Sequence, residues 1–441
     1  MSLNSTLRAA TALALITASG TFAVAQAETI TIATVNNGDM ITMQGLSDDF
    51  TARTGHEVEW VILEENVLRQ RVTTDITTKG GAFDVMIIGM YEAPIWGSNG
   101  WLVPLDDMPA SYQVDDILPA IRGGLSHEGT LYAAPFYAES SMVHYRTDLM
   151  EAAGLEMPKE PTWEFIREAA AAMTDRDNDI NGICLRGKAG WGEGGAFITA
   201  MSNSFGARWF DMDWNAQFDT EQWANTLNFY KGMMDSSGPA GYATNGFNEN
   251  LSLFRQGKCG MWIDATVAAG WLTGEREGTP SEVDGKVGWS IAPNNGLGKN
   301  AGWLWSWALA IPAGTQKEAA AKQFMEWATG PDYLRLVAFE YGHAAVPPGT
   351  RQSLYDNEIY QQVPFAQITL DTILAADPND STVEPSPYVG VQFAAIPEFA
   401  GIATEVSQEF SAAYAGQQTI EEALEKAQAI TNDAMEAAGY R

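Results

Sequence analysis

The first hundred residues alternate between short strands and amphipathic helices. Residues 29–34 alternate in polarity, which predicts a strand, and apolar side chains then recur at helical spacing from Met40 to Phe50. A second strand over 57–63, a second helix over 64–79 and a third, continuously apolar strand over 83–88 follow. This alternation predicts an α/β fold with a mostly parallel sheet and helices on both of its faces.

Three loops of this first part follow strands directly. They span residues 36–39, 64–66 and 90–92, and each carries polar side chains. Ligands of such sheets bind beyond the carboxyl ends of the strands. We therefore expect the three loops to lie together on one rim that faces a ligand.

The second half of the chain is richer in helix signals. Thr162 is placed to cap a helix that runs to Met173, and residues 315–318 and 419–422 have the Thr-x-x-Glu pattern of a capping box. No internal repeat of 20 to 50 residues and no low-complexity linker divides the chain. The domains are therefore expected to be interleaved along the sequence.

The N-terminus has the pattern of a secretory signal peptide. Arg8 precedes an apolar stretch over residues 9–19, and Ala25-Gln26-Ala27 has the small-x-small form of a cleavage site. The stretch is too short and too interrupted by Thr, Ser and Gly to span a membrane. Residues 1–27 are predicted to be removed, so that the mature chain begins at Glu28 and is exported.

Charge narrows the range of partners. The 441 residues include 56 Asp and Glu against 25 Lys and Arg, a formal net charge of −31, and the pI is near 4.3. Nucleic-acid binding rests on clustered Lys and Arg, and docking on an anionic bilayer needs the same charge. Both kinds of partner are therefore disfavoured.

The sequence gives little support to a metal site and leaves open whether its two cysteines form a disulfide. The four histidines have no metal-ligand spacing, and residues 177–182 match the start of a calcium loop but have Lys188 at its twelfth position, where Glu is needed. A tight turn is favoured there, and no metal or cofactor is expected. Cys184 and Cys259 would lie in an oxidising compartment, and whether they pair is left open by the sequence.

Enzyme motifs are missing from the sequence. It contains no Gly-x-Ser-x-Gly elbow, no phosphate-binding loop and no Gly-x-Gly-x-x-Gly after the first strand. A glycosidase needs two carboxylates at a fixed separation, and with 56 acidic residues such a pair can be neither identified nor excluded. A carbohydrate-active hydrolase thus stays an alternative to a binding protein.

Several segments together resemble one known family. They are residues 84–89, 100–106, 131–135, 145–149, 151–155, 162–163, 254–261, 310–320 and 419–424. In this order they resemble the extracellular solute-binding proteins of ABC importers, the maltose-binding-like group. Residues 36–40, 135–142 and 302–311 look most like the sorbitol and mannitol binders of that group.

The resemblance implies a two-lobed periplasmic-binding-protein fold, type II-like, with mixed sheets flanked by helices and a hinge between the lobes. It assigns residues 28–138 and 265–311 to the first lobe, and 139–264 and 312–441 to the second. It further implies a periplasmic, non-enzymatic monomer that captures a sugar alcohol or sugar and delivers it to an inner-membrane ABC permease. A binding protein that reports to a chemoreceptor or sensor is the second alternative.

The family's contact positions can be carried over residue by residue. Carboxylates, amides and guanidinium groups satisfy ligand hydroxyls, and aromatic faces cover their C–H surface. The predicted ligand-binding residues are Asn36, Asn37, Asp39, Glu65, Tyr91, Glu92, Tyr137, Glu139, Arg186, Trp191, Asp264, Trp303, Trp305 and His343.

Structural roles compete with ligand contact at several of these positions. Asn37 also suits a tight turn, Asp39 and Asp264 suit helix capping, and Glu65 suits a solvated first helical turn. His343 suits a structural loop, and at least one of the tryptophans at 303, 305 and 307 is expected in the core. Glu139, which would lie on the first crossing between the lobes, is the strongest candidate.

Overall fold

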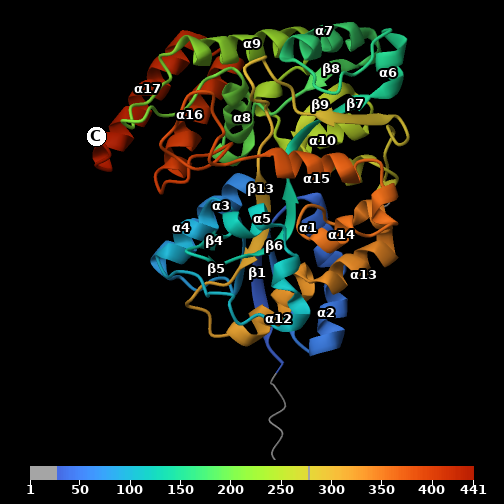
Figure 1. The fold of residues 1–441 in the computed structure, drawn as a ribbon, viewed down its shortest axis with the longest axis vertical. Coiled ribbons are helices and arrows are strands. Elements are labelled where there is room, and N and C mark those ends of the chain that lie inside the picture. The colour runs from blue at the N-terminus through green and yellow to red at the C-terminus, as the bar shows by residue number, and fades with distance from the viewer. Residues whose placement is uncertain (1–26, 277–278) are drawn as a thin grey trace, which may run out of the picture.

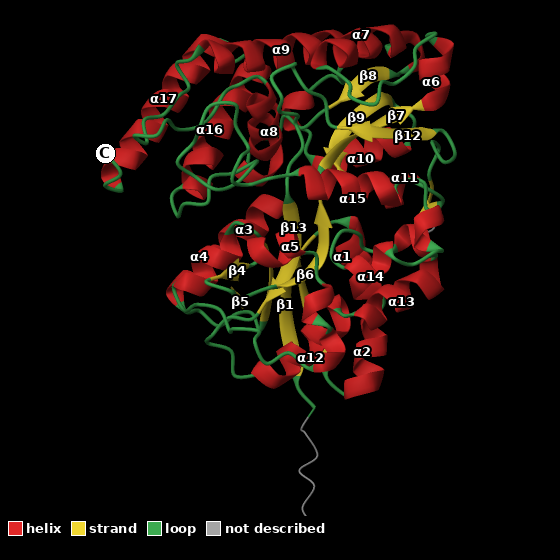
Figure 2. Cartoon of the chain, viewed as in Figure 1, coloured by secondary structure: helices red, strands yellow, loops and turns green. Residues whose placement is uncertain are grey.

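The computed structural model describes residues 27–276 and 279–441, so nearly all of the predicted signal peptide lies outside the described residues. Two main sheets lie in two masses, one above the other in Figure 1. In Figure 2 helices flank the strands in both masses. Within the described ranges, no helix has the length and apolarity needed to cross a membrane.

The first sheet has five strands in the order β2-β1-β3-β13-β6. Their bounds are β1 Thr29–Val35, β2 Glu57–Leu63, β3 Val85–Gly89, β6 Ala134–Glu139 and β13 Trp305–Ala310. β1 pairs in parallel with β2 and β3, while β13 runs antiparallel between β3 and β6. We call this sheet and the helices on it the first lobe. The three strands predicted at the N-terminus are confirmed to within two residues at each end.

Helices of the first lobe cover this sheet. They are α1 Gly38–Gly45, α2 Ser47–Thr54, α3 Glu65–Thr78, α4 Glu92–Ser98, α5 Pro119–Gly124, α12 Glu318–Thr329, α13 Pro331–Tyr341 and α14 Gln352–Tyr355. The first predicted helix is divided at Leu46 into α1 and α2, although Met40, Met43 and Phe50 are buried as its pattern requires. Glu64 caps α3, because its carboxylate accepts from the amides of Asn66 and Val67.

The second sheet has the strand order β12-β7-β9-β8. The strands are β7 Ser141–Arg146, β8 Asn181–Cys184, β9 Cys259–Ala265 and β12 Val287–Ile291. The helices around them are α6 Thr147–Ala152, α7 Trp163–Met173, α8 Ala196–Ser204, α9 Glu221–Ser237, α10 Phe247–Arg255, α16 Phe399–Tyr414 and α17 Ile420–Ala437. We call this assembly the second lobe. Cys184 and Cys259 form a disulfide between β8 and β9, which resolves the question that the sequence left open.

Smaller elements complete the chain. They are β4 Ser126–His127, β5 Thr130–Leu131, β10 Glu275–Arg276, β11 Thr279–Pro280, α11 Ala269–Leu272 and α15 Ala366–Ala375, with single helical turns at Ala110–Tyr112, Val114–Asp116, Arg176–Asn178, Trp191–Gly195, Tyr242–Thr244, Thr266–Ala268, His343–Ala345 and Tyr360–Gln362. α15 contacts both β6 and β12 and therefore lies across the boundary between the lobes (Figure 1).

The chain crosses between the lobes more often than the order of motifs implies. β6 runs through Ser140 into β7, which is the first crossing. β12 pairs with β7, so residues 287–291 belong to the second sheet and not to the first lobe as expected. α12 and α13 pack on the first sheet, with the rings of Phe136 and Tyr333 5.6 Å apart, although they were expected in the second lobe. These pairings join segments far apart in sequence, which motif order does not reveal.

The capping predictions have mixed outcomes. Thr162 and Thr419 cap α7 and α17 as predicted, and Glu422 completes the box at α17. The capping box at Thr315 is wrong. The Thr315 hydroxyl donates instead to Asp84 Oδ1 at 2.7 Å, and α12 begins only at Glu318. Asp84 also forms an ion pair with Lys317. A carboxylate far away in sequence therefore binds the Thr315 hydroxyl that the local pattern predicted as a helix cap.

Candidate functional site

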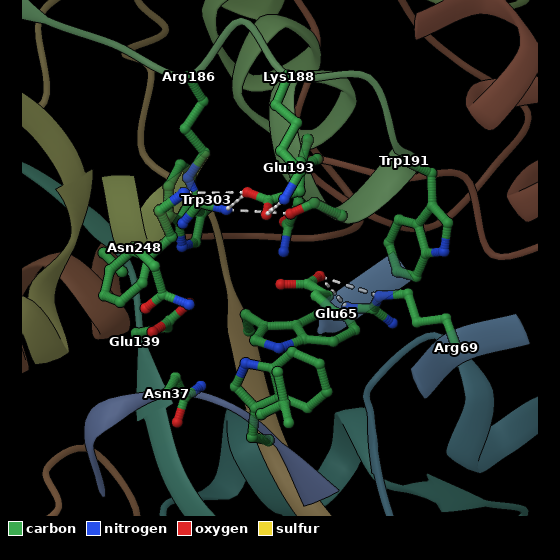
Figure 3. A pocket seen from close by; sticks show the side chains of 18 of the residues that line it. Asn37, Glu65, Arg69, Glu139, Arg186, Lys188, Trp191, Glu193, Asn248 and Trp303 are labelled. Carbon is green, nitrogen blue, oxygen red and sulfur yellow. Dashed lines mark hydrogen bonds and ion pairs between the residues drawn. The ribbon is translucent and has the colours of Figure 1, made fainter. Parts of the chain in front are cut away.

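A cavity opens between the two lobes, with a volume of about 750 Å³ when the solvent at its mouth is counted. The first lobe supplies side chains from the loop after β1, from α3 and from β6 and β13, and the second lobe supplies the segment 186–193 and the start of α10. Figure 3 shows these two sets facing one another. Eight of the predicted residues line the cavity: Asn37, Glu65, Tyr137, Glu139, Arg186, Trp191, Trp303 and Trp305.

Glu139 is the last residue of β6, where the chain leaves the first sheet for the second. The residue is 6% exposed, and its carboxylate has no hydrogen-bond or ion-pair partner among the residues that the structure describes. Burial raises the pKa of Glu139 well above its ordinary value; Arg186 opposes this, while Asp264 and Glu65 add to it. A buried carboxyl group of this kind is an unused hydrogen-bonding group on the cavity wall.

Two more buried polar groups at the cavity are unpaired. The Asn37 amide donates from Nδ2 to the Tyr137 hydroxyl at 2.8 Å, but its Oδ1 has no partner in the described part of the chain. The same holds for the indole Nε1 of Trp303. Buried polar atoms are normally hydrogen-bonded. The cavity wall therefore offers acceptors at Glu139 and Asn37 and a donor at Trp303 to a polar occupant.

Arg186 is fixed by a bidentate ion pair. Its Nε and Nη2 donate to the two carboxylate oxygens of Asp264 at 2.8 and 2.5 Å, and its Nη1 donates to the carbonyl of Gly192 at 3.0 Å. Burial lowers the pKa of Arg186, but Asp264 and Glu193 outweigh this and raise it above the ordinary value. Asp264 is itself fully buried and does not line the cavity. Its predicted roles of hydroxyl contact or helix capping are replaced by the positioning of Arg186.

Arg69 of α3 is the main cavity residue that sequence reasoning missed. Its guanidinium donates to Glu65 at 2.8 and 3.0 Å and to Glu92 at 2.6 Å. Its central carbon lies 4.1 Å from the ring centroid of Trp191, and the rings of Trp305 and Trp307 are 5.2 and 4.7 Å away. The spacing of four residues from Glu65 was the available signal. Arg69 thus contacts two carboxylates of the first lobe and indole rings of both lobes, and these side chains form one cluster.

The tryptophans form an apolar wall around Arg69. Trp305 lies over Gly89, where an added Cβ would come within 1.9 Å of the indole ring. Trp191 of the second lobe packs against Trp305, with ring centroids 5.7 Å apart. Trp307, which was considered for the core, lines the cavity as well. Trp191, Trp305 and Trp307 are each 5% exposed, so these residues are packed against their neighbours and still border the cavity.

Three predicted residues lie behind the cavity wall. Asp39 accepts from the Trp271 indole at 3.0 Å and neither lines the cavity nor caps α1. The Tyr91 hydroxyl contacts the carbonyls of residues 396 and 397 at 3.0 Å. Glu92 binds Arg69 and accepts from the Gly89 amide at 3.0 Å. Each of the three side chains thus binds another group of the protein and lies outside the cavity lining.

Two predicted residues lie farther out. The side chain of Asn36 is exposed, and its backbone carbonyl accepts from Asn248 of α10 at 2.9 Å. His343 begins a single helical turn, His343–Ala345, outside the cavity wall. The structural loop weighed for His343 is the arrangement observed.

Contacts across the cavity hold the two lobes together. Lys188 of the second lobe lies 2.7 Å from Glu64 of the first, and the Asn66 amide donates to the carbonyl of Ala189 at 3.1 Å. Lys188 also lies 3.5 Å from Glu193, whose pKa is raised to about 7, chiefly by burial and then by the charge of Glu65. Further lining residues that the sequence did not indicate are Glu193, Phe247, Asn248, Glu249, Ala196 and Gln392.

The segment that resembled a calcium loop forms a tight turn. Asp175 accepts from the Asn178 amide, Asp179 has a left-handed backbone, and Asn181 accepts from Arg176 as the chain enters β8. Over residues 27–276 and 279–441, no group of three or more His, Cys, Asp or Glu is arranged to hold a metal ion.

Known proteins share this architecture and much of the sequence. The model of the family described as bacterial extracellular solute-binding protein matches residues 36–334. The chain belongs to this family. A mannitol-binding protein of Pseudomonas aeruginosa is 51% identical to it over 415 residues, which cover 94% of each chain. An erythritol/L-threitol-binding protein of Mycolicibacterium smegmatis is 25% identical and covers 75% of this chain and 72% of its own.

A solved structure is closer still to this solute-binding protein. The ABC transporter solute-binding protein of Agrobacterium vitis S4, crystallised with bound D-mannitol, is 61% identical, with a TM-score of 0.92 and coverage of 94% of this chain and 99% of its own. The two-lobed fold expected from the sequence is thereby confirmed. These relatives are binding proteins, and the chain is a solute-binding protein rather than an enzyme.

Proposed function

We propose that this solute-binding protein captures D-mannitol, or a closely related hexitol, in the cavity between its lobes. It then delivers the ligand from the periplasm to an ABC permease in the inner membrane. The proposal is supported by the mannitol-binding relative at 51% identity and by the mannitol-bound structure at 61% identity. That these relatives are binding proteins favours a binding protein over a hydrolase.

The unpaired polar groups at the cavity carry the proposal. A hydroxyl both donates and accepts, so a chain of hydroxyls can serve the acceptors of Glu139 and Asn37 and the donor of Trp303 at once. Each of these groups loses water when the cavity closes, and a ligand that lacks one hydroxyl leaves its partner unsatisfied. This arrangement favours small polyhydroxy ligands over apolar ones.

The indole rings are arranged to form the walls of a cavity for a linear polyol. A pyranose offers a flat C–H face to a stacked ring, whereas a hexitol offers only a narrow zigzag. Trp191, Trp305 and Trp307 stand mostly edge to face, with interplanar angles of 75° and 86° along the series. They enclose Arg69 and leave no broad free face for stacking. Their arrangement therefore fits a narrow, extended ligand better than a ring.

The proposed mechanism is closure of the lobes around one ligand per monomer. Lys188 with Glu64 and Asn248 with the Asn36 carbonyl are contacts between the lobes that such closure would form. α15 and the crossing at Ser140 are the segments about which the lobes would move.

A calorimetric titration of the mature chain with hexitols, pentitols and disaccharides tests the proposed function. We expect saturable binding of D-mannitol with one site per monomer, weaker binding of the pentitols, and a higher melting temperature with ligand. The ligand recovered afterwards should be chemically unchanged. Failure of every hexitol to bind, or the appearance of a product, would overturn the proposal.

A further inference from the structure

The carboxyl groups that line the cavity outnumber its cations, and one of these carboxyl groups has no partner in the described part of the protein. The cavity wall carries five carboxylates, those of Glu64, Glu65, Glu139, Glu193 and Glu249. Four have partners: Glu64 binds Lys188, Glu65 binds Arg69, Glu193 binds Arg186 and Lys188, and Glu249 accepts from the Gly246 amide. Only Glu139 has none in the described ranges.

The cations of the same wall have no spare charge. Arg69 is paired with Glu65 and Glu92, Arg186 with Asp264 and Glu193, and Lys188 with Glu64 and Glu193. Each cation thus already has two carboxylates. An anionic ligand group would have to displace one of these pairs, and beside Glu139 it would find a carboxyl group whose ionisation it opposes.

A cationic ligand group meets the opposite situation. Glu139 is only 6% exposed, and the unpaired Asn37 Oδ1 is a second acceptor on the same wall. Figure 3 shows both side chains on the same side of the cavity, below Arg186. An ammonium group placed there would oppose the effect of burial on the pKa of Glu139 and favour its ionised form. The hydrogen bond between a protonated amine and a carboxylate is shorter and roughly twice as strong as one between neutral groups.

We propose that the cavity also binds amino-deoxy hexitols, with the ammonium group placed against Glu139, and that it discriminates against the corresponding sugar acids. This inference rests on the proposed function, because it requires the hexitol chain to occupy the same cavity. Glu139 then determines specificity for the charge of the ligand as well as accepting from a hydroxyl.

Competitive titrations with three probes test the inference. The probes are 1-amino-1-deoxy-D-mannitol, 2-amino-2-deoxy-D-mannitol and D-mannonate, each compared with D-mannitol at neutral pH. Two amines are needed because the ammonium can replace a terminal or an inner hydroxyl. We expect at least one amine to bind as tightly as D-mannitol and D-mannonate to bind roughly tenfold or more weakly.

A matched pair of variants assigns the effect to Glu139. Glu139→Gln keeps the shape of the side chain and removes its charge, so the ratio of amine to mannitol affinity should fall roughly tenfold. Glu421→Gln changes the net charge equally at an exposed position in α17 and should leave this ratio unchanged.

The outcomes separate this inference from the proposed function. If D-mannitol binds but both amines bind more than tenfold more weakly than it does, the inference is overturned and the proposed function stands. An unchanged affinity ratio in Glu139→Gln also overturns it. If D-mannitol itself does not bind, both fail. Should Glu139→Gln not fold, the comparison of probes on the parent protein still decides.

Discussion

Some polar side chains near the cavity have ion-pair partners in the protein, whereas others have polar atoms with no hydrogen-bond partner among the described residues. Asp264 forms an ion pair with Arg186, and Glu92 with Arg69, so both acidic residues would affect a ligand only through another side chain. Glu139, Asn37 Oδ1 and Trp303 Nε1 have no such role. Substitutions at the two kinds of residue should therefore have different effects.

Glu139→Ala should weaken hexitol binding by about 2 kcal/mol or more, because it removes a buried, otherwise unpaired carboxyl group from the cavity wall. The free energy of unfolding of the unliganded protein should not fall, since burial of the unpaired carboxylate is itself unfavourable. Calorimetric titration and a melt of the same sample give the two quantities. Parent affinity for D-mannitol in Glu139→Ala would remove this residue from the site.

Glu193 should make the stability of the unliganded protein depend on pH. Its pKa is raised from 4.5 to about 7, so the folded state holds the proton more tightly than the unfolded state. The stabilising contribution is present below a pH of about 4.5 and is lost as the pH rises to about 7. Glu193→Gln should therefore flatten the decline of the melting temperature across this interval. A decline as steep as that of the parent would assign the slope to other groups.

Among the elements, local signals predicted more than long-range pairings did. The strands at the N-terminus and the caps at Thr162 and Thr419 follow from patterns within a few residues. The box at Thr315 fails because Asp84, distant in sequence, competes for the hydroxyl. β12 is misplaced for a related reason, since its position depends on pairing with β7.

A position directly after a strand predicted part of the site, although Asn36 and Tyr91 also follow strands and do not line the cavity. Asn37, Glu65 and Glu139 lie within two residues of the carboxyl end of a strand or on it, and all three line the cavity. Arg69 lies a full helical turn into α3, and its neighbours Trp191 and Trp307 come from other parts of the chain. No local pattern reveals such a cluster.

Substitutions of Trp303, which lies just before β13, and of Trp305, its first residue, should separate effects on binding from effects on packing. Trp303→Phe removes only the unpaired indole donor and ring area, so it should weaken hexitol binding by about 1 kcal/mol and change stability little. Trp305→Ala removes a ring packed on Gly89, Trp191 and Trp307, so it should lower the free energy of unfolding by roughly 3 to 5 kcal/mol. Melts and titrations of both variants test this. Equal effects on stability would contradict the distinction.

The disulfide of the second sheet should act on stability and not on the ligand. It joins cysteines 75 positions apart in sequence, and both lie away from the cavity wall. Replacing Cys184 and Cys259 together by Ala should cost about 2 to 5 kcal/mol of unfolding free energy, because the unfolded chain loses a constraint. Affinity for D-mannitol at a temperature where the variant is folded should match that of the parent. A large loss of affinity there would place the disulfide in the binding mechanism.

At the scale of the whole molecule, the two lobes meet over the cavity through a few polar contacts and one aromatic cluster. Lys188 with Glu64 is partly exposed, whereas Trp191 is buried against Arg69 and Trp305. These contacts would break if the lobes separated, which exposes the unpaired groups of the cavity wall to water. Ligand hydroxyls that satisfy those groups should shift the balance toward the closed form.

Small-angle scattering should detect this shift. The radius of gyration of the mature chain should fall when D-mannitol is added, and Lys188→Ala should need more ligand for the same change because it removes one contact between the lobes. An unchanged radius despite saturating ligand would show that the lobes do not move.

The most direct test of the central claim is a crystal structure of the mature chain with D-mannitol. We expect one mannitol between the lobes, with a hydroxyl within hydrogen-bond distance of the Glu139 carboxyl group and others at Asn37 Oδ1 and Trp303 Nε1. A mannitol bound elsewhere, or one in this cavity that leaves all three groups without a ligand contact, would contradict it.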